Sequence, residues 1–149
     1  MLVVNKLTKL TLVHCNIIEI KPRTFYKLGS VKYLHLDNNH IKTVPPGIFA
    51  EVNELQTLTF MYNDIFTVSP EAFLNLNQLF ELDLRGNELT EVQRKTLEPL
   101  TNLTILFLQN NQMKYVHAAS LPYMQLRQLS LMDNKIMGLE RGRSPICRT

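Results

Sequence analysis

The side chains of this sequence that could do chemistry are its two cysteines, its four histidines and the acidic residues beside them. His14 adjoins Cys15, and a histidine beside a cysteine can generate a reactive thiolate. Consecutive residues of a β-strand point to opposite faces, however, so this pair is not expected to meet. His35 and Asp37 are close in sequence and would share one face of a strand, where they could provide two ligands to a metal ion.

A metal site or an active site would need more than these two pairs. The strands expected on either side of His35 and Asp37 carry Thr11, Thr59, Val13 and Met61 at the matching positions, so no third metal ligand is expected there. The four histidines, His14, His35, His40 and His117, are scattered over different repeats and faces. The sequence also lacks the G-x-x-x-x-G-K-[ST] phosphate-binding motif and the H-E-x-x-H zinc motif. We therefore predict no metal site, no cofactor and no enzymatic activity.

The elements that carry these residues follow one unit that recurs along the chain. In LFELDLRGNELTEV, residues Leu79 to Val92, positions 1, 4, 6, 11 and 14 are apolar and position 9 is asparagine. Apolar residues at alternate positions lie on one face of a strand, and the asparagine amide can bond backbone groups that a following turn leaves unpaired. The template fits six times along the chain, and its position 9 holds Cys15, Asn39, Asn63, Asn87, Asn111 and Asn134.

This spacing, L-x-x-L-x-L-x-x-N/C-x-L, resembles that of the leucine-rich repeat family, and the resemblance covers residues 7–139. It implies an α/β solenoid: an arc with a concave parallel β-sheet of about six strands and irregular or 3₁₀ returns on the convex side. We expect the repeats at residues 7–30, 31–54, 55–78, 79–102, 103–125 and 126–139.

The segments that flank the repeats lead to two further expectations. Residues 1–6 would be the end of an incomplete preceding repeat, and residues 140–149 would form a basic C-terminal tail that lies in solvent. Terminal repeats normally need a polar cap over the open core, and no capping motif precedes residue 7. We therefore favour a fragment of a longer protein over a complete chain with an unusually short cap.

Two further apolar columns are expected to close the core behind the sheet. Position 19 holds Phe25, Phe49, Phe73, Leu97 and Leu121, and position 22 holds Leu28, Val52, Leu76, Leu100 and Met124. The segments between these columns contain prolines, which cannot donate a backbone N–H, so they are predicted to be irregular with short helical or 3₁₀ turns. We interpret the phenylalanine column as core and not as a cofactor site.

Cysteine usage leaves the cellular compartment open. Cys15 takes the asparagine position of the first repeat and is expected to be buried and unreactive. Cys147 lies five repeats away, about 24 Å at the spacing of β-strands. The Cα atoms of a disulfide lie within roughly 7 Å, so no bond between the two cysteines is expected. Two unpaired cysteines favour a reducing compartment, whereas in a longer protein Cys147 could pair with another residue.

Other features favour an extracellular location. A repeat of this regular length with phenylalanine at position 19 resembles the repeats of receptor ectodomains and secreted proteins, and Asn102-Leu103-Thr104 is a candidate N-glycosylation site. Such tripeptides also arise by chance, and Leu103 belongs to the core pattern. The first residues lack the apolar stretch and cleavage site of a signal peptide, so none is expected there. No apolar run is long enough to span a membrane, and the multi-cysteine C-terminal cap of extracellular relatives is not seen. We expect a secreted or cell-surface protein, with no membrane insertion by this segment.

Nucleic acid is not an expected partner. The formal net charge is only +3, and the expected concave positions carry charges of both signs. The basic residues are Lys9, Lys32, Arg85 and Arg127, and the acidic ones are Asp37, Glu81, Asp83 and Asp133. A phosphate-binding face needs a basic stripe, which this balance does not provide.

The concave face is the candidate binding surface, because it carries large side chains that the repeat does not require. Protein interfaces are enriched in aromatic residues, methionine and arginine at their centres. We predict that a protein partner binds Tyr33, Met61, Tyr62, Phe80, Arg85, Ile105 and Phe107. The alternative is that these are scattered apolar residues of the kind found on any protein surface.

The resemblance to the family implies a non-enzymatic recognition protein. The repeats are similar to those of Toll-type receptor ectodomains, Slit-like proteins and secreted insect leucine-rich immune proteins, which implies a role in innate immunity or signalling and a protein ligand or co-receptor as partner. Uncapped ends would also permit self-association. Two alternatives are an extracellular-matrix protein in the manner of small leucine-rich proteoglycans and an intracellular leucine-rich repeat adaptor.

Overall fold

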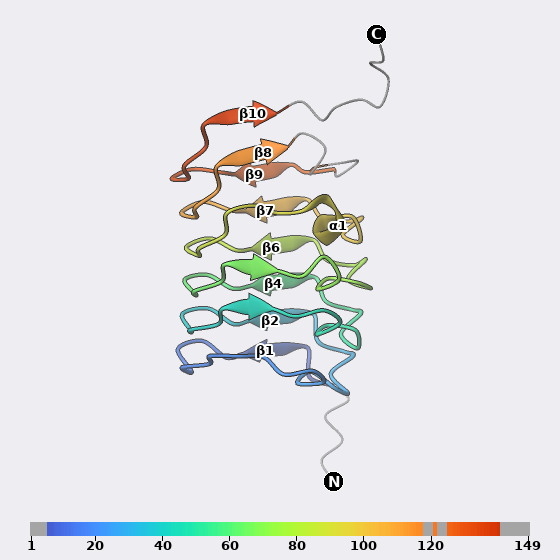
Figure 1. Ribbon diagram of the computed structural model, residues 1–149. Helices are drawn as coiled ribbons and strands as arrows, with labels where there is room; N and C mark the ends of the chain where they lie inside the picture. Colours follow the sequence, from blue (N-terminus) through green and yellow to red (C-terminus); the bar gives the residue numbers. More distant parts are fainter. Residues whose placement is uncertain (1–5, 118–120, 122–124, 141–149) are drawn as a thin grey trace.

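The computed structural model describes residues 6–117, 121 and 125–140, which form a stack of turns around a parallel sheet (Figure 1). The sheet has six strands in the order β1-β2-β4-β6-β7-β9. Their bounds are β1 Lys9–Thr11, β2 Tyr33–His35, β4 Thr57–Thr59, β6 Glu81–Asp83, β7 Ile105–Phe107 and β9 Gln128–Ser130. The predicted leucine-rich repeat arc, with its concave parallel sheet, is confirmed.

Equivalent leucines of successive turns pair across this sheet. Leu34 is the register partner of both Leu10 and Leu58, and Leu106 is the partner of both Leu82 and Leu129. Like side chains therefore stack in columns on the inner side of the sheet, where they face the core. On the outer side the residues that alternate with these leucines also stack in columns, and their identities determine the chemistry of the concave face.

The convex side is more regular than expected. Two small parallel sheets lie opposite the six-stranded sheet (Figure 1): β3 (Thr43–Val44) pairs with β5 (Thr67–Val68), and β8 (Tyr115–His117) pairs with β10 (Gly138–Glu140). The sequence pattern predicted irregular returns and missed these pairs. The β-branched Thr-Val dipeptides of β3 and β5 favour an extended backbone, which the neighbouring turn then completes. A single helical turn, α1 (Arg94–Leu97), lies farther along the chain.

The core fills the space between the two sides and contains both predicted apolar columns. Phe25, Phe49 and Phe73 are buried and stacked, with ring centroids 5.6 Å and 6.1 Å apart and nearly parallel planes. Phe60 meets the Phe49 ring edge-on at 6.1 Å. The second column is also buried at Val52, Leu76 and Leu100, whereas its member Met124 lies outside the described residues. The phenylalanine column is therefore core, as predicted.

The expectation that Cys15 is buried is wrong. Its side chain is exposed, and its Sγ atom lies 3.5 Å from the carbonyl oxygen of Val13. In later turns the residue at this position is enclosed between its own turn and the preceding one. Strand β1 is the edge of the described sheet, so no described turn covers Cys15 from that side. Cys147 and most of the expected basic tail lie outside the described residues.

Candidate protein-binding face

A ladder of buried asparagines forms the end of the sheet at which the chain turns. The side chain of Asn87 accepts a hydrogen bond from the amide of Ile65 (3.0 Å). Its Nδ2 atom donates to the carbonyl oxygens of Phe60 (2.9 Å), Leu84 (3.0 Å) and Arg85 (3.3 Å). Equivalent sets of bonds are made by Asn39, Asn63, Asn111 and Asn134. Each asparagine thus bonds the turn that precedes its own and holds the concave face in register.

The residue just before each ladder position has a left-handed backbone. The six residues at this position are His14, Asn38, Tyr62, Gly86, Asn110 and Asp133, and their φ angles lie between 52° and 67°. Glycine, asparagine and aspartate tolerate this conformation, whereas a bulky aromatic residue adopts it rarely and at a cost. Tyr62 is therefore in a strained conformation that its surroundings must support.

The support for Tyr62 comes from Gly86 on the next turn. A methyl group built on Gly86 would lie 2.4 Å from Cδ1 of the Tyr62 ring, so the ring rests directly on the glycine backbone. The amide of Tyr62 also donates to the carbonyl oxygen of Arg85 (3.0 Å). The ring is held against the next turn while 57% of the residue stays exposed, which makes Tyr62 a large and preorganised surface group.

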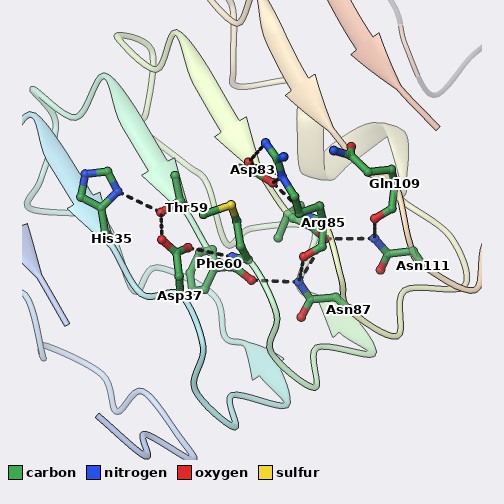
Figure 2. Close-up of polar contacts among 11 residues, drawn as sticks. His35, Asp37, Thr59, Phe60, Asp83, Arg85, Asn87, Gln109 and Asn111 are labelled. Carbon is green, nitrogen blue, oxygen red and sulfur yellow. Dashed lines mark hydrogen bonds and ion pairs between the residues drawn. The ribbon is translucent and has the colours of Figure 1, made fainter. Parts of the chain in front are cut away.

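Arg85 connects the neighbouring aromatic residue to a buried carboxylate. Its Nε atom donates to both carboxylate oxygens of Asp83 (2.9 and 2.8 Å), and Nη2 also contacts Asp83 (Figure 2). The guanidinium carbon lies 4.5 Å from the centre of the Phe107 ring, a cation–π arrangement. Hydrogen bonding to Asp83 raises the pKa of Arg85 above its ordinary value, so the group stays charged at every pH at which the protein would be studied. We call Tyr62, Arg85 and Phe107 the arginine–aromatic cluster.

A second polar group lies beside this cluster and is formed by His35 of β2, Thr59 of β4 and Asp37, which follows β2. The hydroxyl of Thr59 donates to Oδ2 of Asp37 (2.9 Å), and Nδ1 of His35 lies 3.0 Å from the same hydroxyl oxygen (Figure 2). The amide of Met61 donates to Oδ1 of Asp37 (2.8 Å). These bonds hold the side chains of Asp37 and Thr59 in buried positions.

The structure brings together some of the predicted binding residues and separates others. Tyr33, Tyr62 and Phe80 are exposed at 41%, 57% and 47%, whereas Met61, Arg85, Ile105 and Phe107 are partly buried. Arg85 and Phe107 are in direct contact, and Tyr62 bonds the backbone of Arg85. Tyr33 lies on β2, two strands from β6, and belongs to a different part of the face.

The sequence did not predict the hydrogen-bond partners of the buried aspartates Asp37 and Asp83. It also did not predict the left-handed backbone of the residue before each ladder asparagine. Aspartate, asparagine and glycine recur just before the ladder asparagines, and this composition signals a left-handed backbone. The contacts of Asp37 with Thr59 and of Asp83 with Arg85 had a weaker signal. In each case an aspartate stands beside a hydrogen-bond donor in the same or the next turn.

Asn102, the candidate glycosylation residue, is exposed and precedes the buried Leu103. Its Nδ2 atom, to which a glycan would be attached, donates to the carbonyl oxygen of Asn77 (2.7 Å). Among the described residues, no group of three or more histidines, cysteines, aspartates or glutamates is arranged to hold a metal ion. No described helix is long and apolar enough to cross a membrane.

Comparison with known proteins agrees with this geometry. A family model described as leucine rich repeat matches four overlapping segments: residues 5–65, 31–89, 54–113 and 81–136. A search of curated protein sequences finds no match. Among solved structures, the crystal structure of the leucine-rich repeat domain of APL1B is similar, with a TM-score of 0.80 and 24% sequence identity. The similarity covers 91% of this chain and 47% of that one, so the chain spans about half the length of the APL1B domain.

Proposed function

Because the chain belongs to the leucine-rich repeat family, we propose that it is a non-enzymatic recognition module that binds a protein partner through its concave face. Leucine-rich repeat domains are generally protein-binding modules, and the stacked architecture offers a broad surface for this purpose. Within this proposal the arginine–aromatic cluster, together with Phe80, Met61 and Ile105, forms the centre of the interface, and Tyr33 contributes at its edge.

The observation that carries the proposal is the preorganisation of the cluster. Tyr62 is held by Gly86 and Arg85 by Asp83, so both large side chains would lose little conformational freedom when a partner binds. Rigid aromatic and arginine side chains of this kind supply much of the binding energy in protein interfaces. The repeat template does not require either residue.

A substitution experiment on the concave face tests this function. Phe80→Ala combined with Phe107→Ala is expected to weaken binding to a partner at least about tenfold, since interface anchors often contribute about 2 kcal/mol or more each. Partners would be found by screening the tetramerised protein against purified ectodomains and secreted proteins, and affinities would be measured by biolayer interferometry. The matched control is Tyr26→Ala with Leu74→Ala, two residues of the convex returns that are each 43% exposed. Equal affinities for the concave variant and the unaltered protein would refute the assignment.

We further propose that this module is part of a receptor ectodomain or a secreted immune or signalling protein. The support is the resemblance of the repeats to those of Toll-type receptors and secreted insect leucine-rich proteins, together with the exposed Asn102 of the candidate sequon. Binding to collagen or glycosaminoglycan in place of a single protein ligand would favour a matrix protein instead.

Glycan attachment at Asn102 is the most direct test of the extracellular proposal. Protein secreted from eukaryotic cells behind a supplied signal peptide is expected to show a mass excess that a glycosidase removes. Asn102→Gln is expected to abolish this excess, whereas Asn77→Gln, an exposed asparagine outside any sequon, is expected to leave it in place. Intact-mass spectrometry makes the measurement. Secreted protein of unmodified mass would contradict the proposed site.

A further inference from the structure

The hydrogen bonds around His35 determine which of its two ring nitrogens carries the proton. An ionised carboxylate can only accept hydrogen bonds, so the hydroxyl proton of Thr59 points to Asp37. The Thr59 oxygen then has only lone pairs to offer to His35. The ring nitrogen beside it, Nδ1, must therefore be the one that donates. In neutral His35 the proton is on Nδ1, and Nε2 carries a lone pair.

Figure 2 shows Nε2 on the side of the His35 ring that faces away from Thr59, so its lone pair points away from Thr59 as well. Nε2 has no hydrogen-bond partner among the described residues. The buried side-chain atoms without a partner in this part of the chain are Oγ1 of Thr96 and Oε1 of Gln109, so Nε2 is not buried and is open to solvent on the concave face. Behind it lies the carboxylate of Asp37, which is only 5% exposed and bonds two neutral groups, the Thr59 hydroxyl and the Met61 amide. Within the described part of the chain, no basic nitrogen forms an ion pair with this carboxylate.

The charged groups nearby differ in how far they compensate this carboxylate. Lys9 of β1 is exposed and pairs with Tyr33, which stands two residues before His35 on β2. Arg85 is two strands away and is neutralised by its contacts with Asp83. A carboxylate buried without a cation, close to a solvent-facing lone pair, favours a positively charged donor at this point of the surface.

We propose that Nε2 of His35 is a fixed hydrogen-bond acceptor that receives a lysine ammonium or arginine guanidinium of the bound protein. This inference rests on the proposed function, because it specifies the chemistry of the partner on the same face. The concave face then has two regions of different chemistry. The arginine–aromatic cluster offers apolar surface and a neutralised cation, whereas the His35–Thr59–Asp37 group offers an acceptor with negative charge behind it.

The tautomer can be read without any partner, from long-range ¹H–¹⁵N spectra of labelled protein at slightly alkaline pH. We expect His35 to show a protonated Nδ1 and an unprotonated Nε2, the reverse of the form that free histidine favours. In Asp37→Asn the new amide donates to Thr59, so the hydroxyl turns toward His35 and the proton should move to Nε2. In Thr59→Val the constraint is lost, and the spectrum should revert toward that of free histidine.

His35→Gln assigns the signals, and His40 is an internal control. His40 contacts Asp64 through Nδ1 at 3.3 Å in an exposed position. The side chains replaced in Asp37→Asn and Thr59→Val make no hydrogen bond to His40. A protonated Nε2 on His35 in the unaltered protein would overturn the proposal. So would an unchanged tautomer in Asp37→Asn, a substitution that preserves shape and acceptor bonding to the Met61 amide.

The preference for a cation is tested with three small probes of similar size: ethylguanidinium, propionamide and propionate. We expect ethylguanidinium to shift the Nε2 resonance of the unaltered protein and to lose this effect in Asp37→Asn. A larger shift with propionate, or no shift with any probe, would overturn the proposed partner chemistry. These readouts are independent of the Phe80 and Phe107 variants, so failure of the concave face as an interface and failure of the His35 acceptor would be distinguished.

Discussion

Replacing Asn87 with alanine is expected to lower the free energy of unfolding by about 3–5 kcal/mol, because four hydrogen bonds are lost in a buried place. The amide of Ile65 loses its acceptor altogether. The carbonyl oxygens of Phe60 and Leu84 each keep one bond, from Asn63 and Asn111 respectively, so their loss is smaller. The cost is therefore the sum of one orphaned donor, three weakened acceptors and a small cavity.

Urea unfolding of the purified protein, followed by far-ultraviolet circular dichroism, measures this change. Asn134→Ala is the matched control, because Asn134 makes the same set of bonds but is only partly buried. Water can replace its bonds, so a loss of less than about 2 kcal/mol is expected there. If the two substitutions cost the same, burial of the ladder is not the source of its stabilising effect.

Replacing Gly86 with alanine is expected to cost about 2–4 kcal/mol and to displace Tyr62 from the concave face. Two effects add. The left-handed backbone at φ 67° disfavours a side chain by about 1–2 kcal/mol. The new methyl group would also lie 2.4 Å from the Tyr62 ring, which must then leave its position. Because the displaced residue belongs to the arginine–aromatic cluster, the variant should lose affinity for a partner as well as stability.

Gly47 provides a matched control for the backbone effect. Its φ angle is 65°, and a methyl group built on it meets no atom within 4 Å. Gly47→Ala should therefore cost only the backbone component. The double variant Gly86→Ala with Tyr62→Ala should cost less than the sum of the two single substitutions, since the clash is then gone. Equal costs at Gly47 and Gly86 would show that the ring of Tyr62 is not supported by the glycine.

The sequence was sufficient to predict the architecture because the same side chains recur at the same spacing. A leucine at the fourth position of every unit must face the same core in every turn, and Asn39, Asn63, Asn87 and Asn111 repeat one set of bonds. The prediction failed for Cys15, where a rule learned from enclosed turns was applied to the edge of the described sheet. Burial depends on the neighbour as well as on the template.

The concave face was harder to predict because its residues do not repeat. Which side chains bond one another there depends on rotamers in adjacent turns, as for Asp37, which reaches across to Thr59, and Arg85, which lies over Phe107. The left-handed position was hidden for a different reason. Tyr62 is a residue type that rarely adopts this conformation, and the glycine at the equivalent position of the next turn leaves room for its ring.

The asparagine ladder also gives the stack a polarity. The amide of Ile41 is held by Asn63, that of Ile65 by Asn87 and that of Leu89 by Asn111, so every unit is completed by its successor. Removal of one asparagine therefore leaves an unpaired amide in the preceding unit and none in the following unit. With Asn87 removed, the Ile65 amide would exchange its hydrogen with solvent deuterium. The Leu89 amide would stay protected, because it still donates to Asn111 of the following turn.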